Sequence, residues 1–292
     1  MESSDLREPV PESAKASDPG THGDHVVRGQ HMKQLTDSKY WEENWWQCKR
    51  PSQLWLYRDF DFETVRLLRK AGGAGAVRVL EIGAGGSRVL PYVARKFGYK
   101  VYGSDFSPSG CLLLRANLAL QGVCGSVVCE DLFNSALRAD AFDVAYSSGL
   151  IEHFDDTRAV IIEHLRVLRP GGRLVLIIPN LEGVQGRILR RLAPDLLGRH
   201  RVFGPQDLEG ILKSLGLKSV ACGYLGSFFI HIGRDTQWTE VRRWPAWLQL
   251  LVHGSVRLIN GVISFLFRLS PLRPHSRSLS PAFYAVGTKP GV

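Results

Sequence analysis

The sequence predicts an α/β fold, in which a mostly parallel sheet of seven strands is covered by helices on both faces. From residue 77 onward, short apolar runs rich in β-branched residues alternate with longer segments of helical periodicity, the order expected of a parallel sheet. The first run, VRVLEI, is apolar enough for a strand buried on both faces. It ends in a glycine-rich turn at residues 83–86, and a helical pattern follows. Strand, turn and helix therefore form the first unit of the fold.

Two segments precede this fold. The first 36 residues are polar, contain proline, serine and glycine, and lack hydrophobic periodicity, so we expect a disordered tail. Residues 37–76 are rich in aromatic side chains, whose 41/45 and 55/62 spacings fit helix faces. We expect a helical cap that packs on the sheet. Under a second interpretation, some of these aromatic side chains also cover the active site.

The elements of the main domain, residues 77–292, follow in order. A helix is expected at residues 87–98, where the Ser87 hydroxyl can cap the first turn. Another is expected at 108–120, with Pro108 in its first turn and Gly122 just past its end. Two more helices are expected at 157–168 and 205–216. The remaining strands are expected at residues 99–105, 126–131, 142–148, 173–179, 218–225 and 282–289.

An apolar insertion, residues 238–280, lies before the last strand. Its middle, WPAWLQLLVHGSVRLINGVISFLFRL, is apolar all round, and only His253, Arg257 and Arg268 are charged or titratable. A membrane-spanning helix needs about 20 apolar residues, but two glycines, His253 and Arg257 in the interior argue against a span. We expect one or two helices. Three placements stay open: burial against the sheet, the wall of an apolar pocket, and a membrane surface contacted by residues 244–268.

Composition limits the class of protein. Of the 292 residues, 44% are hydrophobic and 22% are charged, as in a soluble globular protein. The net charge of +9 comes largely from scattered arginines rather than from a basic run, which disfavours nucleic acid as a partner. The five cysteines form no framework of pairs, and the N-terminus lacks the apolar core of a secretory signal. We therefore expect a cytoplasmic protein that contacts a membrane only peripherally, if at all.

The turn after the first strand indicates a nucleotide-like ligand. Glycines let the backbone approach a ligand closely, and α/β sheets bind such ligands at the carboxyl end of the first strand. A dinucleotide fingerprint would need a third glycine at position 88, where the chain has Arg88, so NAD is excluded at this spacing. Asp105 ends the second strand, and a carboxylate there can accept hydrogen bonds from both ribose hydroxyls of a nucleoside bound at residues 83–85.

Several motifs occur in the order typical of one family. They are, along the chain, Glu81-x-Gly83-x-Gly85 with Ser87 in place of a third glycine, Asp105, Asp131, FDVAYSSGLIEHF and LRPGG. The first resembles motif I of the class I S-adenosylmethionine-dependent methyltransferases, and the others match later positions of that pattern. The resemblance covers residues 77–179, continues more weakly to 217, and implies a Rossmann-like fold with S-adenosyl-L-methionine as cofactor. The general likeness is to small-molecule (type 11) enzymes, including the ubiquinone-biosynthesis O-methyltransferases.

The resemblance also implies which residues bind the cofactor. Asp131 would accept a hydrogen bond from the adenine amino group, Leu132 would line the same base pocket, and Phe106 could pack on the adenine ring. The full expected set is Glu81, Gly83, Ala84, Gly85, Asp105, Phe106, Asp131, Leu132 and Ser148.

The catalytic group and the metal requirement depend on the segment after the fourth strand. Related enzymes carry Glu-x-x-Glu-His there as a divalent-metal site, but Gly149 replaces the first glutamate and leaves only Glu152 and His153. Because a hard anionic ligand is lost, we expect no required metal. Histidine has a pKa suited to a general base, so His153 is the candidate, with a structural role equally open. His200 and Arg201 are the alternative acceptor-facing residues.

The expected function is methyl transfer from S-adenosyl-L-methionine to a small, apolar or lipid-like acceptor, at oxygen, by in-line displacement. Nucleobase methylation is disfavoured, because no Asn/Asp-Pro-Pro-aromatic segment follows the fourth strand and no cysteine lies between Glu130 and Ala221. An RNA or protein methyltransferase and a non-catalytic S-adenosylmethionine-binding protein are the alternatives. The acceptor and the oligomeric state stay open.

Overall fold

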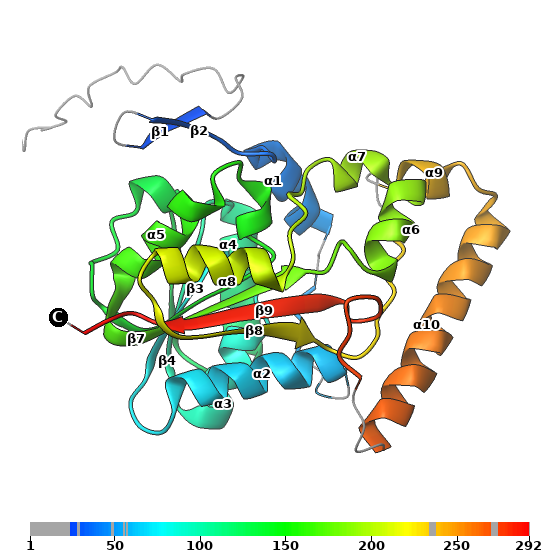
Figure 1. The fold of residues 1–292 in the computed structure, drawn as a ribbon. Coiled ribbons are helices and arrows are strands. Elements are labelled where there is room, and N and C mark those ends of the chain that lie inside the picture. Colours follow the sequence, from blue (N-terminus) through cyan, green and yellow to red (C-terminus); the bar gives the residue numbers. More distant parts are fainter. Residues whose placement is uncertain are drawn as a thin grey trace, which may run out of the picture.

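The computed structural model describes residues 24–27, 30–47, 50–54, 56, 58–233, 238–269 and 274–291. Its centre is a seven-stranded sheet with the strand order β5-β4-β3-β6-β7-β9-β8 (Figure 1). Strands β3 to β7 run parallel to one another, whereas β9 is antiparallel to both β7 and β8. The predicted mostly parallel sheet is thus confirmed. Its strands are β3 (Arg78–Ile82), β4 (Lys100–Asp105), β5 (Gly125–Cys129), β6 (Phe142–Ser148), β7 (Leu168–Pro179), β8 (Lys218–Leu225) and β9 (Ala282–Thr288).

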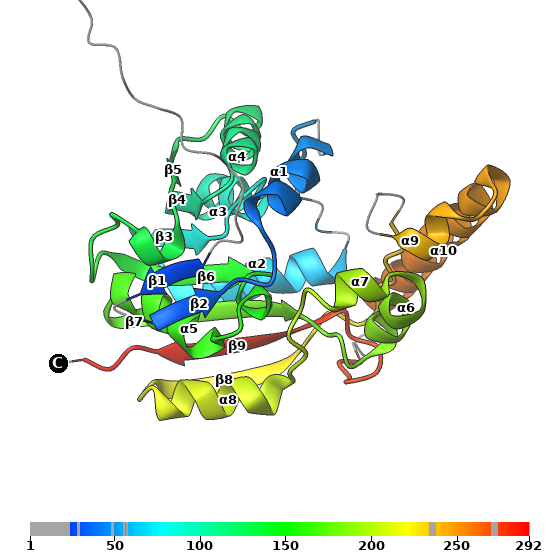
Figure 2. The ribbon, with the colours of Figure 1, turned by 90° about the horizontal axis from the view of Figure 1, so that it is seen from above.

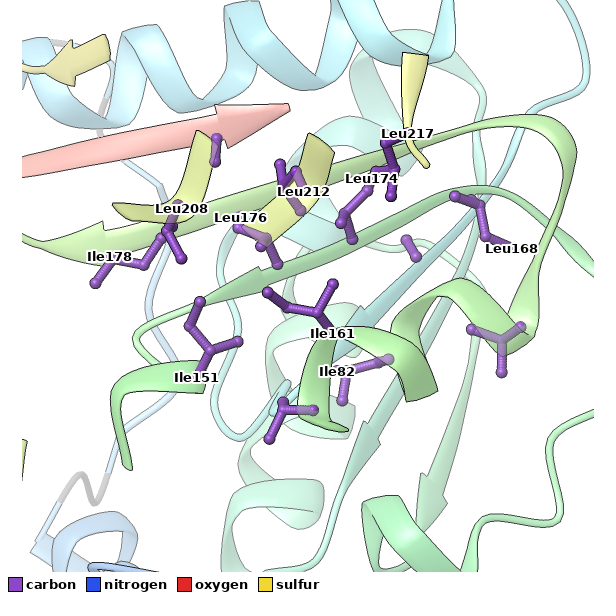
Figure 3. Packing of buried hydrophobic residues seen from close by; sticks show 14 of the residues in the cluster. Ile82, Ile151, Ile161, Leu168, Leu174, Leu176, Ile178, Leu208, Leu212 and Leu217 are labelled. Atoms are coloured by element: carbon purple, nitrogen blue, oxygen red, sulfur yellow. The ribbon is translucent and has the colours of Figure 1, made fainter. Parts of the chain in front are cut away.

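Helices cover both faces of this sheet. On one face, side chains of α2 (Asp59–Gly72), α3 (Val89–Phe97) and α4 (Pro108–Leu120) pack into one apolar cluster. On the other, α5 (Thr157–Val167) and α8 (Pro205–Ser214) pack into a second cluster with strands β6, β7 and β9. Figure 3 shows this second cluster, in which Ile161 of α5 and Leu212 of α8 lie over Leu174 and Leu176 of β7.

The helix ends follow the predicted signals. α4 has the expected bounds, with Pro108 at its first position and Gly122 in the left-handed conformation (φ +64°) after its end. The Ser87 hydroxyl accepts a hydrogen bond from the backbone N–H of Leu90 at 3.3 Å, as expected of a residue that caps α3. By contrast, β7 begins at Leu168 rather than at 173, because Leu168 pairs with Phe142 ahead of an irregularity in the ladder.

Ordered structure begins earlier than the expected residue 37. Strands β1 (Asp24–Val27) and β2 (Gln30–Lys33) form a small antiparallel pair, and α1 (Ser38–Gln47) follows. Gln34 forms an isolated antiparallel β-bridge with Phe154, and the Leu35 N–H donates to the His153 carbonyl at 2.8 Å. The predicted tail therefore ends in a segment held against the main domain. Residues 1–23 and the predicted cap residues Trp55 and Tyr57 lie outside the described part.

Two helices were not predicted from the sequence, and the two helices of the insertion agree with the expected one or two. α6 (Val184–Leu192) and α7 (Pro194–Leu197) follow β7, in a stretch for which the sequence predicts no element. α9 (Thr239–Arg242) and α10 (Ala246–Leu269) form the insertion. α10 is a single helix at the outer edge of the molecule, beyond α6 and α9 (Figures 1 and 2). Only 6% of the residues in its most apolar window are buried, so the interpretation as a helix buried against the sheet is wrong.

Candidate functional site

A cavity of about 1230 Å³ opens at the carboxyl ends of β3, β4, β5 and β6. The chain leaves β3 towards β4 and β5 on one side, while β6 and β7 lie on the other, so the strand order reverses between β3 and β6. Ligands of parallel α/β sheets bind at such a reversal. Nine of the ten predicted site residues line the cavity: Glu81, Gly83, Gly85, Asp105, Phe106, Asp131, Leu132, Ser148 and His153.

Ala84 is the tenth, and it is completely buried within the cluster under α3 rather than exposed to the cavity. A Cβ atom placed on Gly103 would lie 2.9 Å from the Ala84 Cβ, which shows that this methyl group packs against β4. Ala84 therefore shapes the turn through its backbone, whose N–H donates to the Ser104 carbonyl at 3.0 Å.

The glycine-rich turn is held by contacts that the sequence did not reveal. Gly83 and Gly86 have positive φ values, +72° and +59°, which disfavour any residue with a Cβ. The buried Asn117 side chain of α4 donates to the Gly86 and Ser87 carbonyls at 2.9 and 3.0 Å and accepts from the Ser52 N–H at 2.9 Å. One amide thus fastens the turn to α4 and to the segment before α2.

Replacing Asn117 with alanine should lower the free energy of unfolding by about 3 kcal/mol, because three hydrogen bonds are lost and two buried carbonyls lose a donor. Urea unfolding of the two proteins measures this difference. Gln121→Ala, at the end of the same helix, is the control and should change it by less than about 0.5 kcal/mol. Equal stability of Asn117→Ala and wild type would show that the amide does not hold the turn.

Two carboxyl groups lie beside the turn. Asp105 accepts hydrogen bonds from the Gly85 N–H at 2.6 Å and the Ser107 N–H at 2.8 Å, one on each oxygen. Burial raises the pKa of Asp105, and these two donors partly oppose that effect. The Ser87 hydroxyl donates to Glu81 at 2.6 Å, while burial raises the pKa of Glu81 to about 8. Each Asp105 oxygen keeps lone-pair capacity for a further donor.

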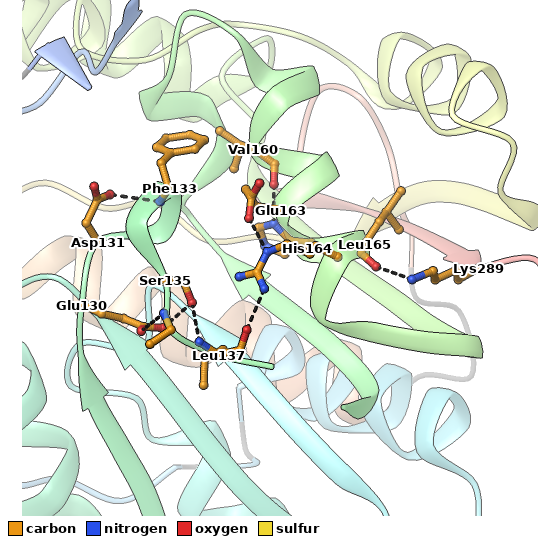
Figure 4. A network of polar contacts seen from close by, with 12 residues as sticks. Glu130, Asp131, Phe133, Ser135, Leu137, Val160, Glu163, His164, Leu165 and Lys289 are labelled. Carbon is orange, nitrogen blue, oxygen red and sulfur yellow. Dashed lines mark hydrogen bonds and ion pairs between the residues drawn. The ribbon is translucent and has the colours of Figure 1, made fainter. Parts of the chain in front are cut away.

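Asp131 begins a segment that is fixed from both sides. It accepts hydrogen bonds from the Phe133 N–H at 3.2 Å and from the Asn134 side chain at 2.7 Å, and so caps the short 3₁₀ helix η1 (Leu132–Asn134). Further along, the Ser135 hydroxyl donates to Glu130 at 2.7 Å (Figure 4). These contacts hold the Asp131 carboxylate at the wall of the cavity.

His153 lies at the opposite wall, in the 3₁₀ helix η2 (Ile151–His153). Its Nδ1 is 3.0 Å from the Arg199 carbonyl oxygen, which can only accept, so the proton is on Nδ1 and the lone pair is on Nε2. Burial, with a smaller effect of His200, lowers the pKa of His153 to about 3. The imidazole is therefore neutral at ordinary pH and carries its lone pair on Nε2.

Glu152 is fully buried beside this histidine. Neither carboxylate oxygen has a hydrogen-bond partner from another described residue, and Oε1 lies 4.0 Å from His153 Nε2. Burial raises the pKa of Glu152 to about 8. The folded protein thus keeps this side chain protonated at neutral pH.

Glu152 should make folding less favourable as the pH rises from 5 to 8. In that window the folded state holds a proton that the unfolded state, with an ordinary pKa near 4.5, releases, so the free energy of unfolding falls. Glu152→Gln removes the titration and should gain about 3 kcal/mol relative to wild type between pH 5 and pH 8. Urea unfolding at both pH values tests this, with the exposed Glu43→Gln as control. A pH-independent difference would rule out the raised pKa.

Three possible ligand atoms for a metal ion meet here. Those of Glu152, His153 and His200 lie within 4.8 Å of one another, and a second such group among the described residues is Asp59, Glu63 and His275. Two imidazoles and one protonated carboxyl group do not fit Mg²⁺, which takes oxygen ligands. The absence of a required metal stays a prediction, and no step proposed below uses one.

The alternative acceptor-facing residues lie differently. The His200 ring is 4.4 Å from the His153 ring, centroid to centroid, but His200 is not among the residues that line the cavity. Arg201 is also absent from the lining of the cavity, and its guanidinium donates to the Asp155 carbonyl. Arg199, which the sequence did not single out, lines the cavity and lies over the Tyr40 ring at 4.7 Å.

The N-terminal segment closes the cavity on the side facing the turn. Leu35, Tyr40, Trp41 and Trp45 line it, in agreement with the interpretation that cap residues cover the site. Glu42 accepts from the Ser107 hydroxyl at 2.5 Å, which docks α1 on the start of α4. A Cβ atom on Gly85 would lie 2.6 Å from the Trp45 indole, so the ring contacts the turn itself. The 41/45 spacing predicts that Trp41 and Trp45 share a helix face. It does not predict that this face contacts the glycine-rich turn.

Comparisons with known proteins agree with this geometry. Residues 80–176 match a protein-family model described as a methyltransferase domain. A ubiquinone biosynthesis O-methyltransferase of Xanthomonas axonopodis pv. citri (strain 306) is 28% identical over 202 residues, which cover 64% of this chain and 81% of that protein. Residues 80–176 contain the glycine-rich turn, Asp105, Asp131 and His153.

Solved structures share the fold at low identity. The 4+2 cyclase SpnF superposes with a TM-score of 0.54 and 16% identity, covering 80% of this chain and 82% of that one. Phosphoethanolamine N-methyltransferase 2 of Haemonchus contortus, in complex with S-adenosyl-L-methionine, gives a TM-score of 0.50 at 18% identity, covering 78% and 52%.

Proposed function

We propose that this chain, which carries a class I S-adenosylmethionine-dependent methyltransferase domain, transfers the methyl group to a hydroxyl of a small apolar or lipid-like acceptor. That the domain is a methyltransferase domain and that its cofactor is S-adenosyl-L-methionine follow from the family match and the fold. The acceptor, the methylated atom and the role of His153 are the proposed part.

The observation that carries the proposal is one cavity with two kinds of lining. Around the glycine turn, Asp105 and Asp131 offer acceptors that suit the ribose and adenine groups of the cofactor, and Glu81 lies beside them. The same cavity is also lined by apolar and aromatic side chains: Leu35, Tyr40, Trp41, Leu54, Phe60, Leu150 and Phe154. A volume of about 1230 Å³ exceeds the usual range for one ligand, about 300–1,000 Å³, and suits two.

The chemistry of the bound cofactor is that of a sulfonium, which gives up its methyl group by in-line displacement. The chain itself positions the two reactants and excludes water, which is where most of the rate enhancement of such a transfer arises. In this proposal, His153 Nε2 accepts the acceptor's hydroxyl proton as the new carbon–oxygen bond forms. Even a weakly basic imidazole suffices for this, because the oxygen becomes strongly acidic once it carries the methyl group.

The test compares two phenols with the same head group, one of them bearing a long alkyl tail. With purified chain and S-adenosyl-L-methionine, the tailed phenol should be O-methylated with a kcat/KM about 100-fold higher than that of the phenol without a tail. The reason is that the tail is buried against the apolar side chains of the cavity. Mass spectrometry of the product gives the methylated atom. Equal rates for both phenols would exclude an apolar acceptor pocket.

A second candidate is a chain that binds the cofactor without methyl transfer. The likeness in fold to a cyclase favours testing it, because this fold is not restricted to methyltransferases. In that case S-adenosyl-L-methionine would bind while no phenol, RNA or protein acquired a methyl group.

A further inference from the structure

The helix α10 has its apolar side chains facing outwards. Nine of its large apolar side chains are between 44% and 69% exposed, out of fifteen such side chains in the described residues. They are Trp247, Leu250, Leu251, Leu258, Ile259, Val262, Phe265, Leu266 and Leu269. At 1.5 Å per residue, the 24 residues form an apolar surface about 36 Å long. An exposed apolar surface of this extent marks an interaction site.

The inner face of the same helix combines polar groups with the partly buried Val256, Ile263 and Phe267. Gln249, His253, Asn260 and Ser264, at spacings of 4, 7 and 4 residues, share one side. Asn260 is buried and exchanges two hydrogen bonds with the Ile230 backbone, at 3.0 Å from its N–H and 2.7 Å to its carbonyl. His253 Nε2 lies 3.4 Å from the Gly233 carbonyl oxygen. The helix is thus fastened to residues 230–233 by polar groups and presents apolar groups outwards, the reverse of an ordinary surface helix.

The charges around α10 indicate whether a lipid bilayer or a second copy of the chain covers this apolar surface. α10 contains Arg257 and Arg268 but no aspartate or glutamate. Next to it, α6 and α9 pack together through Leu189 and Val241 and carry the exposed residues Arg187, Arg190, Arg191, Arg242 and Arg243. Among the described residues, the nearby acidic groups are Glu182 and Glu240, paired with Arg277 and Arg243 at 2.8 Å, and the exposed Asp195 of α7. The Arg243–Glu240 pair adds no net charge, but Arg187, Arg190, Arg191 and Arg242 still outnumber these acids. The apolar surface therefore lies in a basic surrounding, which suits anionic head groups and repels a second copy of itself.

We infer that α10 docks the protein on an anionic lipid bilayer, lying in the plane of the membrane surface with its outer apolar face among the acyl chains. The length and hydropathy of residues 246–267 would suffice for a span, but the Asn260 and His253 contacts hold the helix along the body of the protein. Arg257, in the middle of the helix, would lie at the bilayer centre in a span, where a charge is costly. This docking goes beyond the proposed methyl transfer and does not depend on it.

The experiment is flotation of the full chain with vesicles of neutral phosphatidylcholine and with vesicles containing 30 mol% phosphatidylglycerol (roughly the range of anionic content at which polybasic surfaces bind). The variant Leu258→Glu/Phe265→Glu removes two outward apolar groups. The matched control, Leu120→Glu/Ile162→Glu, changes two exposed apolar residues on α4 and α5. Thermal unfolding and S-adenosylhomocysteine binding verify that all three proteins are folded.

The inference predicts that wild type and control float with the anionic vesicles and that the α10 variant partitions about 100-fold less. It also predicts weaker binding to neutral vesicles and release by alkaline carbonate. Wild type that stays in the soluble fraction would overturn it. So would a wild-type dimer that becomes monomeric in the α10 variant, since a second copy would then cover the surface. Retention in the carbonate pellet would overturn the in-plane placement.

Discussion

Replacing Asp105 with alanine is expected to raise the Kd for S-adenosyl-L-methionine by about 100-fold or more. The carboxylate is fixed by the N–H groups of Gly85 and Ser107 and would accept both ribose hydroxyls, and each charge-assisted bond lost weakens binding by about 1.5–3 kcal/mol. Asp105→Asn keeps one acceptor oxygen and should lie between alanine and wild type. Isothermal titration calorimetry with S-adenosylhomocysteine measures the effect without catalysis.

Asp143→Ala is the matched control for this loss of affinity. Asp143 also sits at a sheet strand and pairs with Arg78 and Arg169, but it does not line the cavity. It should change stability while leaving the Kd within about twofold. If both variants lost affinity equally, the effect of Asp105 would be a general loss of folding. If neither did, the cofactor would lie elsewhere in the cavity.

Replacing His153 with alanine should lower turnover about 100-fold while leaving the Kd for the cofactor within about threefold. The loss is expected in kcat because Nε2 accepts the proton only as the new bond forms. Because burial lowers the pKa of His153 to about 3, wild-type kcat should show no fall near pH 6.5 as the pH is lowered to 5. A solvent-exposed histidine base would lose its activity across that range.

His200→Ala separates a base from a structural histidine. The two rings are neighbours, but only His153 lines the cavity, so His200→Ala should keep turnover within about threefold. Thermal unfolding of both variants reports the packing cost of each lost ring. Unchanged turnover in His153→Ala would end its assignment as the base, and a large loss in His200→Ala alone would transfer that role.

The chain order of the strands made most of the site predictable. Four site residues end a strand or follow one: Gly83, Asp105, Asp131 and Ser148. Parallel strands bring their carboxyl ends to one edge of the sheet, independently of the conformation of the loops. Local signals sufficed for α4 as well, because Pro108 and Gly122 act within one turn of the helix ends. These features depend on near neighbours in the sequence.

What could not be predicted depends on tertiary packing. The aromatic pattern of α1 predicts a helix face but not that Trp45 contacts the glycine turn, a contact between segments about forty residues apart. Ala84 belongs to the motif, yet its side chain is fully buried in the core against Gly103 of β4, a contact that the motif does not reveal. The placement of α10 stayed open for a similar reason: an apolar pattern alone does not show whether a helix is buried or exposed, and the structure shows it exposed.

The most direct test of the proposed function uses S-adenosyl-L-methionine labelled on its methyl group, the purified chain and an extract of the cells that express it. After incubation, the extract is divided into organic-soluble, protein and nucleic-acid fractions. The proposed function predicts label in the organic fraction, absent with Asp105→Ala and strongly reduced with His153→Ala. Label that appeared instead in RNA or protein, with the same dependence on Asp105, would contradict the small apolar acceptor while leaving the cofactor site in place.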